Sequence, residues 1–147
     1  MARILAVEDN EKNRRLLRML LASDGHEVVE AADGEAALER AQEERPDLVI
    51  MDLQLPKLDG FEVTRRLKAD TRLRDVPVLA VSAYAMASDR ERGLAAGCDG
   101  YVSKPIDTRG LLRTVREMLQ AAAGKSSERE GVDPGGGAPE PGGATAP

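Results

Sequence analysis

A chain of 147 residues with a net charge of −5 has room for one domain with a hydrophobic core, and it is too acidic for a nucleic-acid-binding protein that relies on counterion release. Its single cysteine, Cys98, excludes an internal disulfide and argues against a structural zinc site. It opens on a strand-like pattern and holds no apolar run of the ~18 residues that a membrane-spanning helix needs, so we expect a cytoplasmic protein without membrane insertion.

Apolar runs and amphipathic segments alternate five times along residues 1–121. The runs are typical of short buried strands, expected at 3–7, 26–31, 48–52, 76–81 and 99–103. The amphipathic segments have the spacing of helices, which are expected to begin near Asn10, Gly34, Gly60, Ser88 and Asp107. The fourth start has the pattern of a capping box, Ser88 followed by Glu91. This alternation with short connections predicts an α/β fold, a parallel sheet with helices on both faces.

The central run at 48–52 reads Leu-Val-Ile-Met-Asp. In it, four consecutive apolar residues are followed directly by one carboxylate. A strand buried on both faces presents its last side chain at the C-terminal edge of a parallel sheet, where open α/β sheets bind ligands. Asp52 is therefore a candidate for a functional site, although an aspartate at this place could also cap a helix or form a turn.

The residues after Ala121 lose the apolar periodicity and become rich in Gly, Pro, Ser and Glu. Such a segment buries too little apolar surface to offset its conformational entropy. We therefore expect one domain at residues 1–121 and a disordered tail at residues 122–147.

Polar residues stand where the predicted strands end. Glu8 and Asp9 follow the first strand, and Asp52, Ser82 and Lys104 end or follow the third, fourth and fifth. In a parallel sheet these residues share one edge, where two carboxylates ~4 Å apart repel each other by about 4 kcal/mol at an effective dielectric constant of about 20. Such a cluster raises its pKa values or binds a cation, and oxygen ligands without Cys or His favour a hard cation such as Mg²⁺.

A carboxylate, a lysine and a hydroxyl beside Mg²⁺ are a set suited to phosphoryl chemistry. Asp52 could form an acyl phosphate, with Lys104 pairing with a phosphoryl oxygen and Ser82 donating a hydrogen bond. Each residue also has an ordinary explanation, as a helix-capping acid, a turn serine or a solvated surface lysine. Those explanations do not account for the coincidence of all of them at one sheet edge.

These residues resemble the signature of the response-regulator receiver domain, the CheY-like family, over residues 2–121. The signature is carried by Glu8-Asp9, Asp52 before a loop with Pro56 and Gly60, Ser82-Ala83, and Lys104-Pro105. The resemblance implies a flavodoxin-like (βα)5 fold with strand order 2-1-3-4-5, which is taken from the family. It also implies that a histidine kinase phosphorylates Asp52, and that Mg²⁺ is held by Glu8, Asp9, Asp52 and the backbone carbonyl of Gln54.

The resemblance implies further roles at the same edge. Ser82 matches the switch hydroxyl of the family and Tyr101 matches the switch aromatic. Lys104 matches the family lysine, whose bond to the following proline is usually cis. Gln54 and Tyr84 flank the site and are expected to tune the lifetime of the phosphate.

The segment at 81–86 and the lack of an output domain make the chain most similar to stand-alone, DivK-like single-domain response regulators. The implied function is a phosphorelay switch that accepts a phosphoryl group on Asp52 and changes a partner-binding face. That face consists of the fourth helix, the fifth strand and the last helix. Its partners would be a histidine kinase or a histidine phosphotransfer protein, and a downstream protein. Its only catalysis would be self-phosphorylation and autodephosphorylation.

Three other functions share parts of this pattern. A receiver-like intermediate would only shuttle phosphate to a histidine phosphotransfer protein. A Mg²⁺-dependent phosphohydrolase with an aspartyl nucleophile would share Asp52 and Lys104, but it needs a substrate-binding cap and a second acid where Gln54 stands. A flavin carrier of flavodoxin-like fold needs a Gly/Ser/Thr-rich phosphate loop after the first strand, where Glu8 and Asp9 stand instead.

Three remaining features have plainer expectations. His26 starts a strand away from the acids and is expected on the surface, and Cys98 is expected to be a small buried residue. Arg109, Arg113 and Arg116 share one face of the last helix. A solvated stripe is the default for such a face, and partner docking is the alternative.

Overall fold

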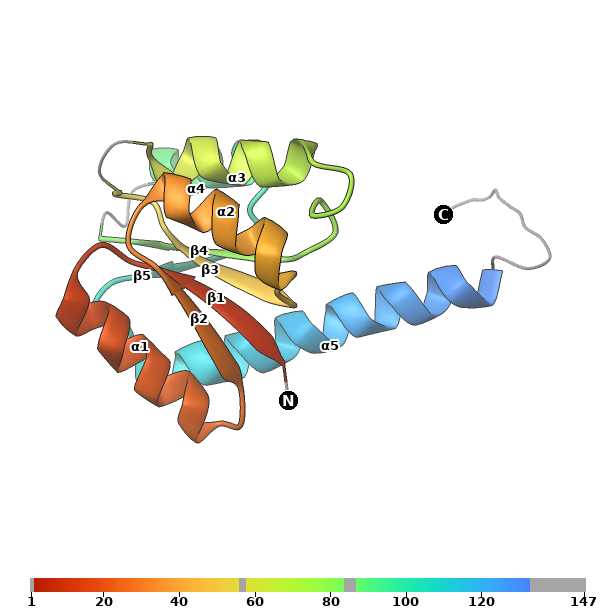
Figure 1. Ribbon diagram of the computed structural model, residues 1–147, viewed down its shortest axis with the longest axis horizontal. Coiled ribbons are helices and arrows are strands. Elements are labelled where there is room, and N and C mark those ends of the chain that lie inside the picture. The colour runs from red at the N-terminus through yellow and green to blue at the C-terminus, as the bar shows by residue number, and fades with distance from the viewer. Residues whose placement is uncertain (1, 56–57, 84–86, 133–147) are drawn as a thin grey trace.

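Five parallel strands form one sheet in the computed structural model, and helices cover both of its faces (Figure 1). The structure describes residues 2–55, 58–83 and 87–132, without the side chains of residues 87, 89 and 125–132. The strands are β1 (Arg3–Val7), β2 (Glu27–Ala31), β3 (Leu48–Asp52), β4 (Val78–Ser82) and β5 (Gly100–Ser103). The helices are α1 (Glu11–Ser23), α2 (Gly34–Glu44), α3 (Gly60–Ala69), α4 (Ala87–Ala96) and α5 (Thr108–Val132). The order β2-β1-β3-β4-β5 and the parallel pairing confirm the expected flavodoxin-like α/β fold.

The central strands are buried on both faces, and their side chains divide between two hydrophobic clusters. On one face, Val49 and Met51 pack with residues of α2, α3 and α4. On the other face, Leu48 and Ile50 pack with residues of α1 and α5. Figure 1 shows these two groups of helices on opposite sides of the sheet. The division follows from the two-residue period of a strand, and it explains why β3 is apolar at successive positions.

Asparagine and aspartate side chains start three of the helices. Asn10, Asp33 and Asp59 accept hydrogen bonds from backbone amides three residues ahead, at 3.0, 2.8 and 2.9 Å. Each such cap stabilises its helix by about 1 kcal/mol relative to alanine. Gly25 and Gly97 follow the ends of α1 and α4 with φ angles of 87° and 109°, a left-handed backbone conformation that glycine adopts without strain.

The strands begin within two residues of the expected positions, and the differences at β4 and α4 have a structural cause. β4 begins at Val78 rather than at residue 76, because Val76 still belongs to the preceding turn and donates its amide to Leu73 at 3.0 Å. α4 begins at Ala87, which places Ser88 inside the helix rather than at its cap. The capping-box interpretation of this segment is therefore wrong.

The last helix, α5, extends farther than expected and covers 25 residues up to Val132. The segment 122–132, which we expected to be disordered, continues this helix. Alanine has the highest helix propensity, so the run at 121–123 can sustain a helix without an apolar stripe. Figure 1 shows α5 projecting past the N-terminal ends of the strands. Residues 133–147 lie outside the described part of the chain, so the rest of the expected tail remains a prediction.

His26 is not a surface residue. Its side chain is only 9% exposed, and its Nδ1 accepts a hydrogen bond from the backbone of Ala2 at 3.3 Å. Beside it, Arg116 of α5 makes a two-pronged ion pair with Asp24, at 2.9 and 2.5 Å, and this guanidinium lowers the pKa of the Asp24 carboxyl. One member of the arginine stripe thus ties α5 to the turn after α1. Cys98 is buried as expected.

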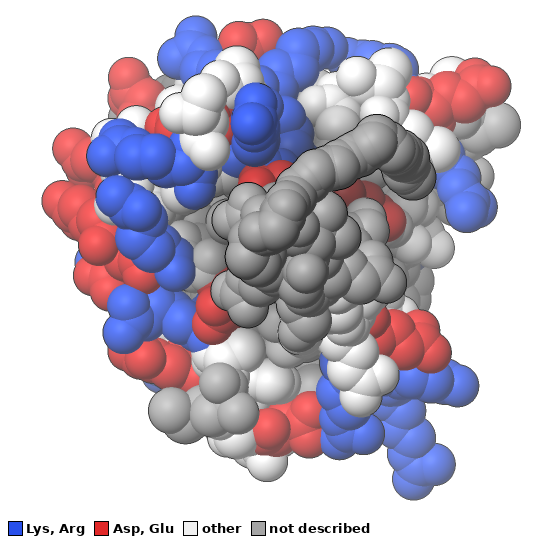
Figure 2. Space-filling model, turned by 90° about the vertical axis from the view of Figure 1, so that its right-hand side faces the viewer, with Lys and Arg blue, Asp and Glu red and all other residues white. Residues whose placement is uncertain are grey.

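Acidic and basic side chains intermingle at the end of the molecule from which α5 projects (Figure 2). Exposed ion pairs such as Arg3–Glu27, at 3.2 Å, belong to this kind of surface and contribute about 0–1 kcal/mol each. Among the described residues, no helix combines the length and the apolar content needed to cross a membrane.

Candidate functional site

The ends of four strands bring the predicted site residues to one edge of the sheet. Asp52 is the last residue of β3 and Ser82 is the last residue of β4. Glu8 and Lys104 directly follow β1 and β5. Because all four strands run in parallel, these residues meet even though Glu8 and Lys104 are 96 positions apart in the chain. The convergence that the strand pattern predicted is therefore present.

Three carboxylates lie close enough to hold one metal ion. One oxygen each of Glu8, Asp9 and Asp52 falls within 4.8 Å of the others. Glu8 and Asp52 are each 3% exposed, whereas Asp9 is exposed. The donor set contains only oxygen, and its exposed member leaves room for water ligands, which fits Mg²⁺.

The ammonium group of Lys104 lies between two of these acids. Its Nζ is 3.2 Å from Oε1 of Glu8 and 3.2 Å from Oδ2 of Asp52. Burial alone would lower the pKa of Lys104, but the carboxylates of Asp52 and Glu8 raise it above its ordinary value. Lys104 therefore supplies a fixed positive charge at the place where an anion would approach Asp52. Its bond to Pro105 is cis, as the resemblance implied.

Glu8 is held by a backbone hydrogen bond as well as by Lys104. Its Oε2 accepts from the amide of Asn10 at 3.0 Å. Burial raises the pKa of Glu8, the hydrogen bond from Asn10 lowers it, and the neighbouring charge of Asp52 raises it again. The net direction is upward, so ionisation of Glu8 is less favourable here than in water, and a cation bound to the cluster would favour the ionised form.

Both carboxylate oxygens of Asp52 have partners. Oδ1 accepts from the backbone N of Gln54 at 2.9 Å, and Oδ2 accepts from Lys104. Gly60 lets α3 begin against this end of β3, because a Cβ at position 60 would overlap the carbonyl oxygen of Asp52 and lie 2.7 Å from Cα of Leu53. The glycine thus fixes how closely the loop after β3 returns to the aspartate.

The side chain of Gln54 crosses from the loop after β3 to the loop after β4. Its Nε2 donates to Oγ of Ser82 at 3.1 Å, and its Oε1 accepts from the backbone N of Ala83 at 3.1 Å. Ser82 itself is fully buried. Sequence reasoning gave Gln54 a metal-binding carbonyl and an effect on phosphate lifetime, and it missed this bridge. A long amide two residues after the site aspartate was the only signal for it.

Tyr101 lies on β5, opposite Ala80 of β4. Its side chain is half-buried and packs against the cluster on the α2–α3–α4 side of the sheet. A Cβ on Gly93 of α4 would lie 4.0 Å from its ring carbon Cδ2. Tyr101 therefore connects the fifth strand with the fourth helix, where the expected switch face lies. Tyr84, the other expected tuning residue, lies outside the described residues.

Arg14 of α1 supports the site from behind. Its guanidinium donates to the backbone carbonyl of Glu8 at 3.0 Å and to the carboxylate of Glu30 at 3.2 Å. Arg18, one turn along α1, pairs with the same carboxylate at 3.0 Å. These contacts hold the end of β1 against α1 and β2. The sequence showed arginines among the leucines of α1, but it gave no sign of their partner.

An apolar hollow of about 360 Å³ opens beside the acids. Its walls come from α1 and from the segment after β5, and they include Leu16, Leu17, Leu20, Lys104, Pro105 and Ile106. Leu16 is 58% exposed, which is high for a leucine next to other apolar side chains. The hollow therefore places exposed apolar surface directly beside Glu8 and Lys104.

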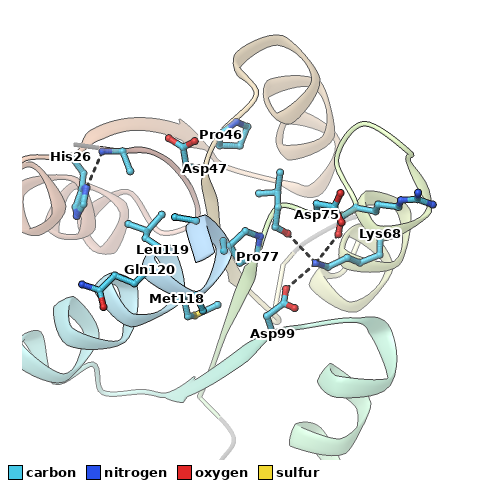
Figure 3. Close-up of a pocket in the computed structure, with 16 residues that line it drawn as sticks. His26, Pro46, Asp47, Lys68, Asp75, Pro77, Asp99, Met118, Leu119 and Gln120 are labelled. Carbon is cyan, nitrogen blue, oxygen red and sulfur yellow. Dashed lines mark hydrogen bonds and ion pairs between the residues drawn. The ribbon is translucent and has the colours of Figure 1, made fainter. Parts of the chain in front are cut away.

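A larger cavity of about 780 Å³ lies at the opposite edge of the sheet (Figure 3). There, Lys68 donates to the carboxylate of Asp99 at 2.8 Å and to the carbonyl of Val76 at 2.9 Å. The walls of this cavity contain none of the acids that converge at the other edge. Its lysine, Lys68, already donates to protein groups. The larger cavity and the cluster of charges thus lie at different edges of the sheet, and we take the edge with the charges as the candidate site.

The chain matches the family described as the response regulator receiver domain over residues 4–116. The polar-differentiation response regulator DivK of Brucella anthropi is 46% identical over 116 residues, which cover 79% of this chain and 94% of that protein. The chemotaxis protein CheY4 of Vibrio cholerae has a structure with a TM-score of 0.76 at 32% identity, covering 80% of this chain and 98% of that one. The receiver domain of the sensor histidine kinase PA1611 of Pseudomonas aeruginosa, which has a magnesium ion in its active-site cleft, gives a TM-score of 0.76 at 38% identity, covering 81% and 98%.

The chain therefore belongs to the response regulator receiver domain family of two-component signalling. Its likeness to DivK spans nearly the whole length of that single-domain regulator. Receiver domains typically bind Mg²⁺ and exchange phosphoryl groups with histidine kinases or phosphotransfer proteins, and the cluster of Glu8, Asp9 and Asp52 is compatible with such an ion.

Proposed function

We propose that the protein is a stand-alone response regulator of a two-component phosphorelay, which accepts a phosphoryl group on Asp52 and thereby changes its partner-binding face. One observation carries this proposal: the buried carboxylate of Asp52 contacts the ammonium of Lys104 and lies beside the oxygens of Glu8 and Asp9. A nucleophile, a fixed cation and a set of metal ligands thus stand within one small site.

The transfer itself needs few protein groups. A carboxylate oxygen of Asp52 attacks the phosphorus of a phosphohistidine on the donor, and a P–O bond forms as the P–N bond breaks. The imidazole nitrogen leaves with the bonding electron pair and takes a proton from water. Mg²⁺, held by Glu8, Asp9, Asp52 and the backbone carbonyl of Gln54, would neutralise charge on the phosphoryl oxygens. Lys104 stays protonated and can pass its contact from Asp52 to a phosphoryl oxygen.

The response is a population shift between two arrangements of the same fold. Ser82 moves toward the phosphoryl group, and Tyr101 turns farther inward. Because Tyr101 packs near Gly93, this change alters the face formed by α4, β5 and α5. Leu94 on α4 is 55% exposed and offers an apolar contact to a downstream protein on that face.

The phosphodonor protein docks on the apolar hollow between α1 and the segment after β5. A donor histidine has to reach Asp52 from outside, and this hollow is lined by Lys104 and Glu8 of the site itself. Leu16 gives the hollow an exposed apolar wall, which a histidine kinase or a histidine phosphotransfer protein would cover. The acids and the docking surface therefore both take part in the transfer of the phosphoryl group from the donor histidine to Asp52.

The protein turns over no separate substrate, and self-phosphorylation and autodephosphorylation are its only reactions. Gln54 supports this view over a phosphohydrolase, because its amide is engaged with Ser82 and Ala83 where such an enzyme would need a second acid. A regulator that only shuttles phosphate would differ in one measurable way: it would pass its phosphoryl group to a phosphotransfer protein without a change at the α4–β5–α5 face.

The test is intact-protein mass spectrometry after incubation with acetyl phosphate and Mg²⁺. We expect one adduct of about 80 Da, a single acyl phosphate, in the wild type and none in Asp52→Asn. The asparagine keeps the size of the side chain but has neither the nucleophilic oxygen nor the ligand charge. An adduct that persists in Asp52→Asn would place the acceptor elsewhere, and labelling without Mg²⁺ at the same rate would remove the metal from the proposal.

A further inference from the structure

Resting on the proposed function, we infer that Gln54 is a positioning residue that holds Ser82 and Ala83, at the end of β4, in the resting arrangement. The phosphoryl group on Asp52 has to displace the Gln54 carboxamide before the switch can occur. This role concerns the side chain of Gln54 and is independent of the metal-ligand role of its carbonyl.

The orientation of the amide follows from its partners. The backbone N–H of Ala83 can only donate, so the atom 3.1 Å from it is the carbonyl oxygen Oε1 of Gln54. The NH₂ group then faces Oγ of Ser82, which accepts a hydrogen bond at 3.1 Å. One carboxamide therefore occupies polar groups of two neighbouring residues, the last of β4 and the first after it.

The same residue is tied to the acceptor. The backbone N of Gln54 donates to Oδ1 of Asp52 at 2.9 Å, two positions back in the chain. Gln54 thus links the carboxylate that takes the phosphoryl group with the hydroxyl that senses it. A change at Asp52 can therefore act on Gln54 both at its backbone N–H and at its side-chain carboxamide.

A phosphoryl group on Asp52 competes for these partners. Its oxygens are anionic acceptors, and the hydroxyl of Ser82 and the backbone N–H of Ala83 are donors at the end of β4, the strand that pairs with β3. The N–H of Ala83 already donates to Gln54, and the Ser82 oxygen accepts a hydrogen bond from the Gln54 NH₂ group. Hydrogen bonds to a charged acceptor are roughly twice as strong as those to a neutral amide, so the phosphoryl group prevails and the carboxamide is released.

Burial makes the hold on Ser82 effective. Ser82 is fully buried. In the resting arrangement, bulk water therefore cannot take the place of the Gln54 NH₂ group as a donor to the Ser82 oxygen. Ala83 is exposed, and its N–H can turn to water when the amide leaves. The hydrogen bonds of Gln54 to Ser82 and Ala83 thus both stabilise the resting state, and a phosphoryl group must overcome this stabilisation.

Gln54→Met tests the inference, because methionine has a similar length and volume but cannot make either hydrogen bond. We expect the variant to be half-saturated by beryllofluoride, a non-covalent analogue of the phosphoryl group, at a concentration about tenfold lower than the wild type. The amide resonance of Tyr101 in the unphosphorylated variant should also move toward its position in the beryllofluoride-bound wild type. A merely damaged site would bind beryllofluoride more weakly, so the sign of the change is informative.

Gln42→Met is the matched control, because Gln42 is exposed on α2 and the same substitution there should leave both measurements at their wild-type values. Gln54→Asn is a second variant, since its amide is one methylene too short to hold both Ser82 and Ala83, and it should shift both readouts in the same direction as methionine. Unchanged or weaker beryllofluoride binding in folded Gln54→Met, with normal acetyl phosphate labelling of wild-type Asp52, overturns the role of Gln54 alone. Absence of labelling in the wild type overturns the proposed function instead.

Discussion

The ammonium of Lys104 and the carboxylate of Asp52 lie 3.2 Å apart, although 52 residues separate them in the chain. The pair sets a positive charge against the buried carboxylate, and the site as a whole has three carboxylates against one ammonium. An additional cation would therefore relieve the remaining repulsion, while the lysine stays ready to bind an incoming anion.

In metal-free buffer, the free energy of unfolding should fall as the pH rises above 4.5, the ordinary pKa of a glutamate, through the titration of Glu8. Burial raises the pKa of Glu8 in the folded state, so between its unfolded and folded pKa values the native protein binds a proton that the unfolded chain has lost. Stability is therefore lost as the pH rises through that window. Urea titrations at several pH values should show a smaller fall in Glu8→Gln, and an identical fall in both proteins would contradict this account of Glu8.

Millimolar Mg²⁺ should raise the melting temperature of the wild type more at about pH 8 than at about pH 5, since protons compete with the ion for the carboxylates. Differential scanning calorimetry measures this directly. Asp9→Asn is the informative variant, because Asp9 is exposed and its replacement removes a ligand charge without disturbing the buried pair. Equal melting temperatures with and without Mg²⁺ in both proteins would remove the metal site.

Ser82→Ala should still be labelled by acetyl phosphate, but its response at Tyr101 should be weaker by about tenfold or more, the effect of losing one hydrogen bond to a charged group. Lys104→Ala should behave in the same way, because the ammonium contacts the phosphoryl group rather than accepting it. Tyr101→Ala should change the affinity for a downstream partner more than it changes labelling. Amide NMR spectra before and after labelling separate these effects, and a full response in Ser82→Ala would rule out the hydroxyl as the sensor.

Leu16→Ala should slow phosphorylation by a histidine kinase or a phosphotransfer protein by about tenfold, a loss of about 1.4 kcal/mol that is typical of truncating an apolar interface residue. Labelling by acetyl phosphate should not change, since this small donor needs no docking surface. Leu94→Ala is the matched control: its leucine is 55% exposed, against 58% for Leu16, but it lies on α4. Transfer rates from a phosphorylated donor protein provide the measurement. Equal slowing by both substitutions would move the donor contact away from the hollow.

The predicted sheet and the meeting of the site residues had a common physical basis. Buried strands such as β3 leave a continuous apolar run, and parallel strands share one C-terminal edge, so Asp52, Ser82 and Lys104 could be brought together without any side-chain geometry. The strand order came from the family, because β1 and β3 carry equivalent patterns and periodicity does not rank neighbours.

The same reasoning could not predict hydrogen bonds and ion pairs between side chains that are distant in the sequence. The amide of Gln54 meets Ser82 because of the path of two loops, which no periodicity records. Arg116 meets Asp24 because α5 lies beside the turn after α1. His26 is covered by the start of the chain at Ala2, although a lone polar residue before a strand is usually exposed. The alanine run at 121–123 was ambiguous, because it lacks an apolar stripe and yet favours helix.

Gly60→Ala should destabilise the protein by more than about 2 kcal/mol, since the new methyl group would overlap the backbone at Asp52 and Leu53, neither of which can move aside. The same substitution should also reduce labelling, because the loop after β3 positions the aspartate. Gly124→Ala is the matched control on α5, where a Cβ meets nothing within 4 Å and alanine should stabilise the helix by up to about 1 kcal/mol. Urea unfolding measures the free energy of unfolding of both variants. An unchanged value in Gly60→Ala would show that the loop after β3 has room to adjust.

Truncation after Gly124 should change the free energy of unfolding by less than about 0.5 kcal/mol and leave acetyl phosphate labelling intact. The buried residues of α5, Leu111 and Val115, and the partly buried Met118 and Leu119 all precede the cut. Equilibrium unfolding of the full and shortened chains provides the comparison. A loss above about 2 kcal/mol would mean that residues 125–147 contribute to the packing of the domain.

The length of α5 has a mechanical consequence. The helix begins at Thr108, next to the edge that carries Lys104, and it ends at Val132, beyond the far edge of the sheet. At 1.5 Å per residue its axis is about 37 Å long, so a tilt of about 5° at the Thr108 end would displace the Val132 end by about 3 Å. A small angular change beside the acids would thus become a movement of a side-chain width on the other side of the molecule, in the manner of a lever arm.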